Sequence, residues 1–196
     1  MKSSKRGLSE RALLVGITGA SGAPYAVAFL RLLQELSQPV EVIVTEPGLF
    51  VLEHETGLTL ADLEKVCARL WREDHLAAPP ASGSVPYRGM VVIPCSMGTL
   101  SAIAQGAARN LLQRAADVTL KEGRPLVLVV RETPLNLVHL RNMLAAAQAG
   151  AVIYPAMPAF YPRPQSLQEM LDFFAKRLAE FLEIPVENLQ RWGENG

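Results

Sequence analysis

The stretch Ala12–Gly22, ALLVGITGASG, decides the fold because a buried strand passes directly into a tight turn. Residues 12–18 are apolar enough for a strand covered on both faces, and residues 19–22 are small enough for a sharp turn. The apolar residues that follow recur at helical spacing to about Leu36, and Pro24 is tolerated in the first turn of that helix. This strand–turn–helix unit is typical of α/β proteins that bind ligands beyond the end of the strand.

The same alternation of strand and helix continues along the chain and predicts a parallel sheet covered by helices. Further strands are expected at residues 40–45, 90–93, 126–130 and 151–154. Further helices are expected at residues 49–55, 59–70, 100–105, 110–122, 137–149 and 166–183. Thr59 and Ser166 are the expected N-caps of two of these helices. We predict one domain over residues 1–196, with a flexible tail at 1–11 and a C-terminal tail at 185–196.

Composition and charge argue against several classes of protein. The 196 residues include 19 basic and 19 acidic side chains, so no net field attracts nucleic acid or an acidic membrane. Cys67 and Cys95 lie far apart in the sequence and predict no disulfide, and no apolar signal segment is visible, which favours the cytoplasm. His54, His75 and His139 show no metal-ligand spacing, so we expect no metal.

Polar residues follow four of the predicted strands, at positions 18–21, 45–46, 95–99 and 131–133. Because ligands sit beyond the carboxyl ends of parallel strands, we expect these clusters to converge on one site. The turn at 19–22 and the segment PCSMGTLSAIAQG, residues 94–106, both place small residues and hydroxyls before a helix, where free amides favour a phosphate. The turn lacks the GxGxxG fingerprint and the P-loop lysine, so a mononucleotide is favoured. Taken alone, it is more simply an ordinary tight turn.

Two charged pairs leave a structural and a functional interpretation open. Arg114 and Lys121 share one helix face and can bind a phosphate dianion, but Asp117 between them favours a salt-bridge ladder. Arg131 and Glu132 end a strong strand. They are either a structural ion pair, or a phosphate ligand beside a general acid or base.

Two uncharged groups also leave a structural and a functional interpretation open. Cys95 precedes a helix and can be a reactive thiol, but we expect a packed small residue. Phe160 and Tyr161, in the segment PAMPAFY, either wall an apolar substrate pocket or plug the core.

Taken in order, these segments resemble the UbiX-type flavin prenyltransferases. The resemblance runs from about Leu13 to Glu194 and is carried by GITGASG, APPASGS, PCSMGTLSAIAQG, NLLQRAADVTLKEGRPLVLVVRETP, HLRNM, PAFYPRPQS and QRWGE. The long block Asn110–Pro134 and the fixed order of the set are its most specific parts.

The resemblance implies a three-layer Rossmann-like flavoprotein fold with a mostly parallel sheet. It implies a metal-independent reaction that joins the dimethylallyl group of dimethylallyl monophosphate to N5 and C6 of reduced FMN. The prenylated FMN then serves UbiD-type decarboxylases, as in ubiquinone biosynthesis. The family forms homo-oligomers, often dodecamers, with active sites at subunit contacts.

The resemblance also implies roles for individual residues. FMN contacts fall on Gly19, Ala20, Ser21, Thr45, Ser96, Met97, Gly98, Thr99 and Arg131. Prenyl-phosphate contacts fall on Lys121, Arg131, Tyr161 and Arg177, with Arg114 beside them. The acid/base carboxylates are Glu132 and Glu55, with Ser21 as a relay. Family members commonly have Ser at the position of Thr45, and some have Trp near His75, a departure that affects the wall of the prenyl pocket.

Two alternative functions remain open from the sequence. One is an FMN-dependent decarboxylase of the cysteine-decarboxylase type, and the other is a non-catalytic FMN carrier. The set of Lys121, Arg131, Tyr161 and Arg177 favours prenyl transfer over both.

Overall fold

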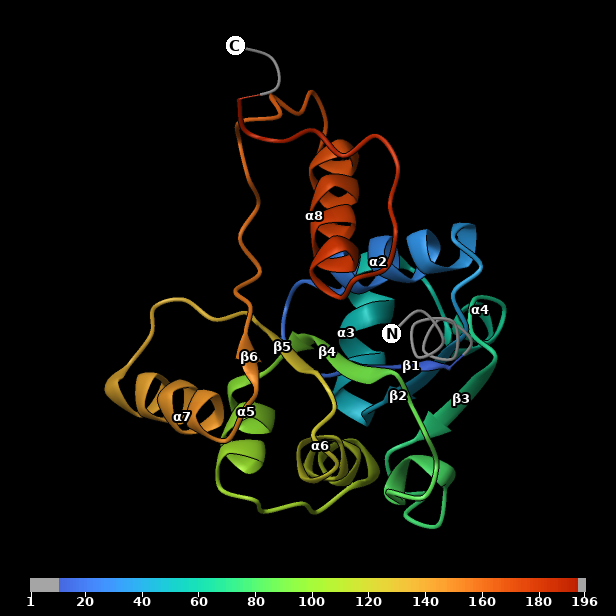
Figure 1. Ribbon diagram of the computed structural model, residues 1–196, viewed down its shortest axis with the longest axis vertical. Coiled ribbons are helices and arrows are strands. Elements are labelled where there is room, and N and C mark those ends of the chain that lie inside the picture. The colour runs from blue at the N-terminus through green and yellow to red at the C-terminus, as the bar shows by residue number, and fades with distance from the viewer. Residues whose placement is uncertain (1–10, 194–196) are drawn as a thin grey trace, which may run out of the picture.

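A six-stranded sheet forms the centre of the computed structural model, which describes residues 11–193 (Figure 1). Its strands are β1 (Leu13–Ile17), β2 (Val40–Val44), β3 (Arg69–Arg72), β4 (Gly89–Cys95), β5 (Leu126–Val130) and β6 (Val152–Ile153). All neighbouring strands are parallel and lie in the order β3-β2-β1-β4-β5-β6. The predicted α/β fold is confirmed, and the sheet is entirely parallel within the described residues.

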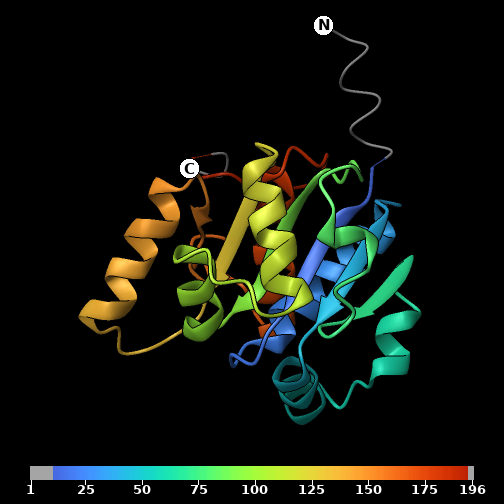
Figure 2. The ribbon, with the colours of Figure 1, turned by 90° about the horizontal axis from the view of Figure 1, so that it is seen from below.

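Helices cover both faces of the sheet and give the fold three layers (Figure 1, Figure 2). They are α2 (Ala23–Glu35), α3 (Glu46–Thr56), α4 (Leu60–Glu64), α5 (Met97–Ala104), α6 (Leu111–Lys121), α7 (Leu137–Gln148) and α8 (Leu167–Phe181), with a 3₁₀ turn η1 (Pro79–Ala81). Helices α2 and α8 pack together on one face, and α5 and α6 lie on the other with α7 beside α5. Each α/β connection therefore carries the chain across one face of the sheet.

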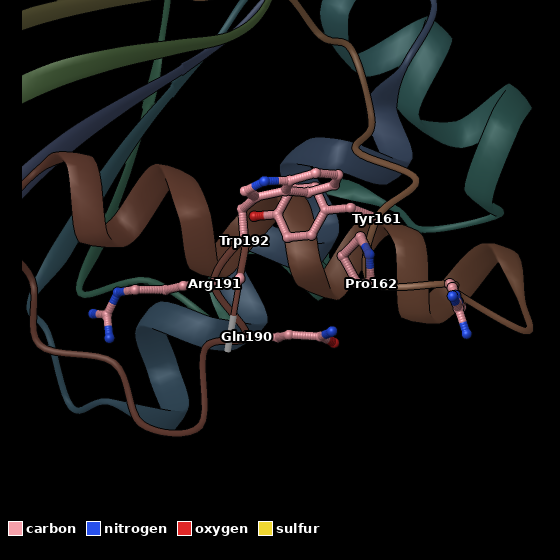
Figure 3. Close-up of a pocket in the computed structure, with 7 residues that line it drawn as sticks. Tyr161, Pro162, Gln190, Arg191 and Trp192 are labelled. Carbon is pink, nitrogen blue, oxygen red and sulfur yellow. The ribbon is translucent and has the colours of Figure 1, made fainter. Parts of the chain in front are cut away.

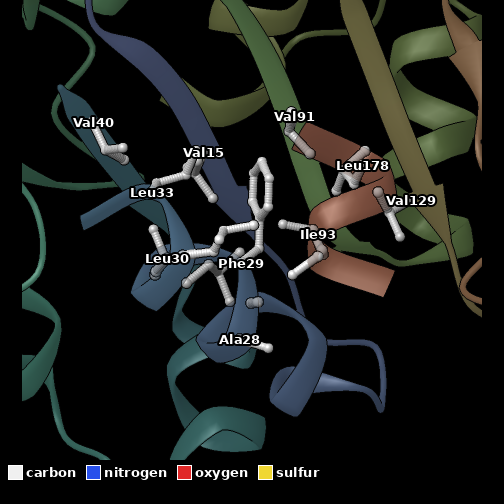
Figure 4. Close-up of a cluster of buried hydrophobic side chains, with 14 of the residues drawn as sticks. Val15, Ala28, Phe29, Leu30, Leu33, Val40, Val91, Ile93, Val129 and Leu178 are labelled. Carbon is white, nitrogen blue, oxygen red and sulfur yellow. The ribbon is translucent and has the colours of Figure 1, made fainter. Parts of the chain in front are cut away.

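Alternate side chains of each strand supply the two cores. Val15 faces α2, where Phe29 and Leu33 are fully buried (Figure 4). Its neighbour Leu14 belongs to the cluster on the opposite face, which includes Leu112 of α6. Burying a side chain such as Phe29 contributes about 1.5–3 kcal/mol. This packing fixes where α2 and α6 begin, at the edge that carries the site.

The predicted helix from Thr59 to about Leu70 is wrong in its second half. Helix α4 ends at Glu64, and β3 follows as an edge strand in which Leu70 pairs with Val42. The helix-forming residues of this segment favoured one long helix, but pairing with β2 overrides that local preference. The N-cap is as predicted, since Thr59 donates its backbone N–H to the carboxylate of Asp62 at 3.0 Å.

Residues 1–10 and 194–196 are outside the described residues, so the predicted N-terminal tail falls there almost entirely. After α8 the chain turns back along that helix (Figure 1), with Leu189 buried. Within residues 11–193 no helix is both long and apolar enough to cross a membrane.

Candidate functional site

The candidate site lies at the carboxyl edge of the sheet, between β1 and β4, where the strand order reverses. Ligands bind at this switch point in open α/β sheets. Thr18 follows β1, is 1% exposed and joins the two strands there. Its Oγ1 donates to the carbonyl oxygen of Pro94 at 2.7 Å and accepts from the backbone N–H of Ser96 at 2.9 Å. The start of α5 is therefore fixed against the turn that precedes α2.

The N-terminus of α2 is occupied by a carboxylate of the chain itself. Glu55 of α3 accepts through Oε2 from the backbone N–H groups of Gly22 at 2.9 Å and Ala23 at 2.8 Å. Burial alone would raise the pKa of Glu55, but hydrogen bonds from Ser21 and the two amides, with the charge of Arg131, hold that pKa below its usual value. The amides of Gly22 and Ala23 are therefore not free for a ligand, and the next residue, Pro24, has no backbone N–H.

The N-terminus of α3 is closed in a similar way. The hydroxyl of Thr45 accepts from the backbone N–H of Gly48 at 3.0 Å and donates to the carbonyl oxygen of Ile17 at 3.3 Å. The carboxylate of Glu73, which follows β3, accepts from the backbone N–H of Glu46 at 2.7 Å. Its second oxygen accepts from the asparagine side chain that caps α6. Glu73 thus connects the starts of two helices at this edge.

The N-terminus of α5, in contrast, is open. The hydroxyl of Ser96 accepts from the backbone N–H of Thr99 at 3.3 Å and donates to the Thr99 hydroxyl at 3.1 Å. The backbone N–H groups of Met97 and Gly98 have no intrahelical partner, and no acceptor is found for them within residues 11–193. A Cβ added to Gly98 would meet no atom within 4 Å. Free amides and the positive end of the helix dipole can here hold a phosphate.

Arg131 places a cation beside these helix starts. Its backbone N–H donates to the carbonyl oxygen of Cys95 at 3.3 Å, and its Cγ lies 3.7 Å from where a Cβ on Gly22 would be. Burial raises the pKa of Tyr25, and the charge of Arg131 opposes that rise. The charge of Arg131 also lowers the pKa of Glu55. One guanidinium therefore influences both the turn before α2 and the carboxylate that closes it.

Glu132 and Cys95 differ in what they can do at this edge. Glu132 is exposed, and its carboxylate accepts from the backbone N–H of Thr133 at 2.9 Å. Its side chain is therefore accessible at this edge. Cys95 is fully buried, and burial raises its pKa to about 12. Its thiol stays protonated at neutral pH, and the expectation of a packed small residue is confirmed.

Tyr161 lies on the extended segment between β6 and α8, away from the core. Its ring is edge-on to Phe173 at 5.4 Å and to Trp192 at 5.7 Å between ring centroids. Together with Arg163 and Arg191, Tyr161 and Trp192 line a cavity of about 630 Å³ (Figure 3). Trp192 was not predicted as a site residue, although it lies in the segment QRWGE.

Arg177 of α8 lines a second hollow, of about 240 Å³, which it shares with Tyr161. Its guanidinium pairs with Glu180. Burial raises the pKa of Tyr154 in the same hollow, and Arg177 opposes that rise. Phe160 is 71% exposed, so it does not plug the core.

Arg114 and Lys121 each pair with an acidic side chain close to them in the sequence. Arg114 pairs with Asp117 at 2.6 Å, which is half of the predicted salt-bridge ladder, whereas Lys121 pairs with Glu122. Helix α6 runs from the carboxyl edge towards the start of β5, so Lys121 lies about 10 Å along the axis beyond Arg114. Lys121 therefore stands at the opposite edge of the sheet from Arg131.

Polar residues from every predicted cluster do converge at the carboxyl edge. Glu73 was missed because β3, which positions it, was not predicted. Within residues 11–193 no group of three or more His, Cys, Asp or Glu side chains is arranged to hold a metal ion. The fold and the site together define a Rossmann-type protein that binds a phosphate-bearing ligand.

Comparison with known proteins narrows this class. The sequence matches the Flavoprotein family over residues 1–194. Flavin prenyltransferase UbiX of Halalkalibacterium halodurans is 45% identical over 190 residues, covering 92% of both chains. The chain belongs to the flavoprotein family, among the UbiX-type flavin prenyltransferases.

Solved structures agree with this membership. AnUbiX (PadA1), in complex with FMN and dimethylallyl pyrophosphate, gives a TM-score of 0.91 at 38% identity, covering 94% of this chain and 98% of that one. A dodecameric FMN-dependent UbiX-like decarboxylase from Escherichia coli O157:H7 gives 0.89 at 40% identity, covering 92% and 98%. The FMN-dependent cysteine decarboxylase SpaF, at 18% identity and a TM-score of 0.62, shares the fold alone.

Proposed function

We propose that this chain is a flavin prenyltransferase that joins the dimethylallyl group of dimethylallyl monophosphate to N5 and C6 of reduced FMN. The products are prenylated FMN and phosphate. The observation that carries the proposal is the open N-terminus of α5 beside Arg131, at the switch point of a flavoprotein-family sheet. The close relatives named as flavin prenyltransferases support the reaction class.

The carboxyl edge fits FMN, which carries a single phosphate group. When bound in its reduced form, FMN supplies the electron-rich N5 and C6 that accept the prenyl group. Small residues line the approach, and the free amides of α5 suit a phosphate oxygen. We assign flavin contacts to Gly19, Ala20, Ser21, Thr45, Ser96, Met97, Gly98, Thr99 and Arg131. Because the first amides of α2 and α3 are already bonded within the chain, the phosphate belongs at α5 rather than at either of them.

The departing phosphate needs stabilisation by the protein, because a monophosphate leaves less readily than a diphosphate. Fixed cations and donors aimed at the developing charge provide it. Arg131 already lies at the carboxyl edge. Tyr161 and Arg177 share a hollow and act as a donor and a cation. Aromatic rings near Tyr161 hold positive charge on the prenyl group and exclude water.

Lys121 enters the site from a neighbouring copy of the chain in this proposal, since within one chain it stands at the opposite edge. Helix α7 leaves Leu137, Leu140 and Leu144 about half exposed or more, an apolar face that a second copy can cover. The dodecameric structural neighbour supports a homo-oligomer, and we propose a dodecamer. Arg114, held by Asp117 on the same helix as Lys121, reaches the site in the same way.

Ring closure through C6 releases a proton, and we assign its removal to Glu132, Ser21 and Glu55. The Ser21 hydroxyl hydrogen-bonds to the carboxylate of Glu55, and the lowered pKa of that carboxylate keeps it ionised near neutral pH. Glu132 is the proposed proton acceptor, reached through the leaving phosphate and Ser21, and Glu55 is the second carboxylate at this edge. Replacing Glu132 with Gln should slow product formation without changing the affinity for FMN. Unchanged turnover in that variant would remove Glu132 from the mechanism.

The reaction is tested by weighing the flavin. The protein is incubated without oxygen with reduced FMN and dimethylallyl monophosphate, and the extracted flavin is analysed by mass spectrometry. A gain of one prenyl unit supports the proposal. Unchanged flavin together with decarboxylation of a cysteine-ending peptide would assign the chain to the cysteine decarboxylases. Bound FMN with neither reaction over hours would make it a carrier.

The recipient of the product and the cellular location are proposed from the family. The product passes to a UbiD-type decarboxylase, and the reaction takes place in the cytoplasm. Residues 1–196 act as one FMN-binding domain, which agrees with a family match over residues 1–194. Mixing prenylated product with an apo UbiD-type decarboxylase and measuring restored decarboxylation tests the first of these statements.

A further inference from the structure

The turn between β1 and α2 is where many α/β proteins of this strand order bind the pyrophosphate of a dinucleotide. A glycine in that turn lets the pyrophosphate approach the backbone. In this chain the space beside Gly19 is filled by α3, because a Cβ on Gly19 would lie 2.5 Å from Cβ of Pro47. Gly19 therefore permits contact between two parts of the chain, not contact with a dinucleotide.

The amides of the same turn are also used within the chain. The Oε2 atom of Glu55 accepts from Gly22 at 2.9 Å and from Ala23 at 2.8 Å, and these are the two donors that a pyrophosphate would need. The Ser21 hydroxyl bonds to the same carboxylate, and Arg131 lies beside it. A carboxylate of the chain thus stands where a dinucleotide places its phosphates.

We propose that Glu55 is a specificity-determining residue that restricts the site to a mononucleotide flavin and rejects dinucleotides such as FAD. The inference rests on the proposed function only in taking a flavin as the ligand. A pyrophosphate at this turn must displace the carboxylate from two charge-assisted hydrogen bonds and then lie beside a like charge. Since bonds of that kind are the strong ones, FAD should bind at least about 100-fold more weakly than FMN.

The test compares FMN and FAD binding by full-length protein from which bound flavin has been removed. Flavin fluorescence titrations give both dissociation constants for the natural protein and for Glu55→Ala, Glu55→Gln and Glu53→Ala. Glu53 is exposed on the same helix, so Glu53→Ala is the matched control for loss of a carboxylate. Thermal melts of each protein show whether it is folded.

The dissociation constant for FAD divided by that for FMN should fall by at least about tenfold in Glu55→Ala, because the two amides and the space of the carboxylate become available to a pyrophosphate. It should fall less in Glu55→Gln, by about threefold or more, since the charge is lost but an oxygen remains. Glu53→Ala should keep the natural ratio. The inference is overturned if the natural protein binds FAD within about threefold of FMN, or if both folded Glu55 variants keep the natural ratio.

The outcome is separable from that of the prenyl-transfer experiment. If the ratio shifts as expected but no prenylated flavin forms, the selection of mononucleotides stands and the proposed reaction fails. If prenylated flavin forms and the ratio does not shift, the reaction stands and this role of Glu55 fails. If Glu55→Ala does not fold, Glu55→Gln and the natural protein still decide the question.

Discussion

Replacing Gly98 with alanine separates the stability of α5 from its ability to hold a phosphate. Gly98 is the second residue of α5, and a Cβ there meets no atom within 4 Å, so the substitution fits without a clash. Alanine is favoured over glycine inside a helix by about 0.5–1 kcal/mol. The free energy of unfolding should therefore rise by up to about 1 kcal/mol, which for a chain of this length raises Tm by about 2–4 °C.

Binding should change in the opposite direction. The space beside Gly98 is open, and we expect a methyl group there to crowd a phosphate at the amides of Met97 and Gly98. Losing one charge-assisted hydrogen bond there costs about 1.5 kcal/mol or more. At least one of the two phosphate-bearing reactants should then bind about tenfold more weakly. FMN titration gives one affinity, and KM for dimethylallyl monophosphate reports on the other.

Gly106→Ala is the matched control, at the opposite end of the same helix. Gly106 has a φ of 63°, where an alanine is strained by about 1–2 kcal/mol, so this variant should melt earlier. It should bind both reactants normally because it lies past the far end of α5. If Gly98→Ala melts higher and still binds both reactants as the natural protein does, no phosphate sits at the α5 N-terminus.

The remaining predictions concern Glu55, the core and the thiols. Because the folded pKa of Glu55 lies below its unfolded value near 4.5, its contribution to stability is complete above that pH and is lost as the pH falls through the folded pKa. Glu55→Gln should therefore flatten the acid side of a stability–pH curve, and an unchanged curve would contradict the carboxylate's role. Phe29→Ala should lower the free energy of unfolding in urea by about 3–5 kcal/mol, whereas a loss below 1 kcal/mol would contradict full burial. Burial raises the pKa of Cys95 to about 12 and that of Cys67 to about 11, so iodoacetamide at pH 7 should label them only after unfolding. Peptide mass spectrometry reads this out, and native labelling of Cys95 would be inconsistent with its position.

The central strands could be predicted because a parallel strand covered on both faces is a continuous apolar run. Leu126–Val130 is such a run, and it forms β5 with all five residues buried. Arg69–Arg72 could not be found in this way, because an edge strand with arginines at both ends carries little of that pattern. Its role depends on pairing with β2, which local sequence does not reveal.

The position of the site could be predicted for the same reason, since parallel strands bring their carboxyl ends to one edge. The sequence could not predict which helix N-termini are free. That depends on Glu55 and Glu73, which reach α2 and α3 from other elements. The position of Lys121 does follow from the fold once it is known. A helix that leads into a parallel strand ends at the amino edge, so Lys121 is remote from Arg131 in its own chain.

A crystal structure with FMN and dimethylallyl monophosphate bound tests the central claim most directly. We expect one phosphate within hydrogen-bond distance of the amides of Met97 and Gly98 and near Arg131. The carboxylate of Glu55 should still accept from the backbone N–H groups of Gly22 and Ala23. A phosphate on the first amides of α2, with the Glu55 carboxylate displaced, would contradict that claim.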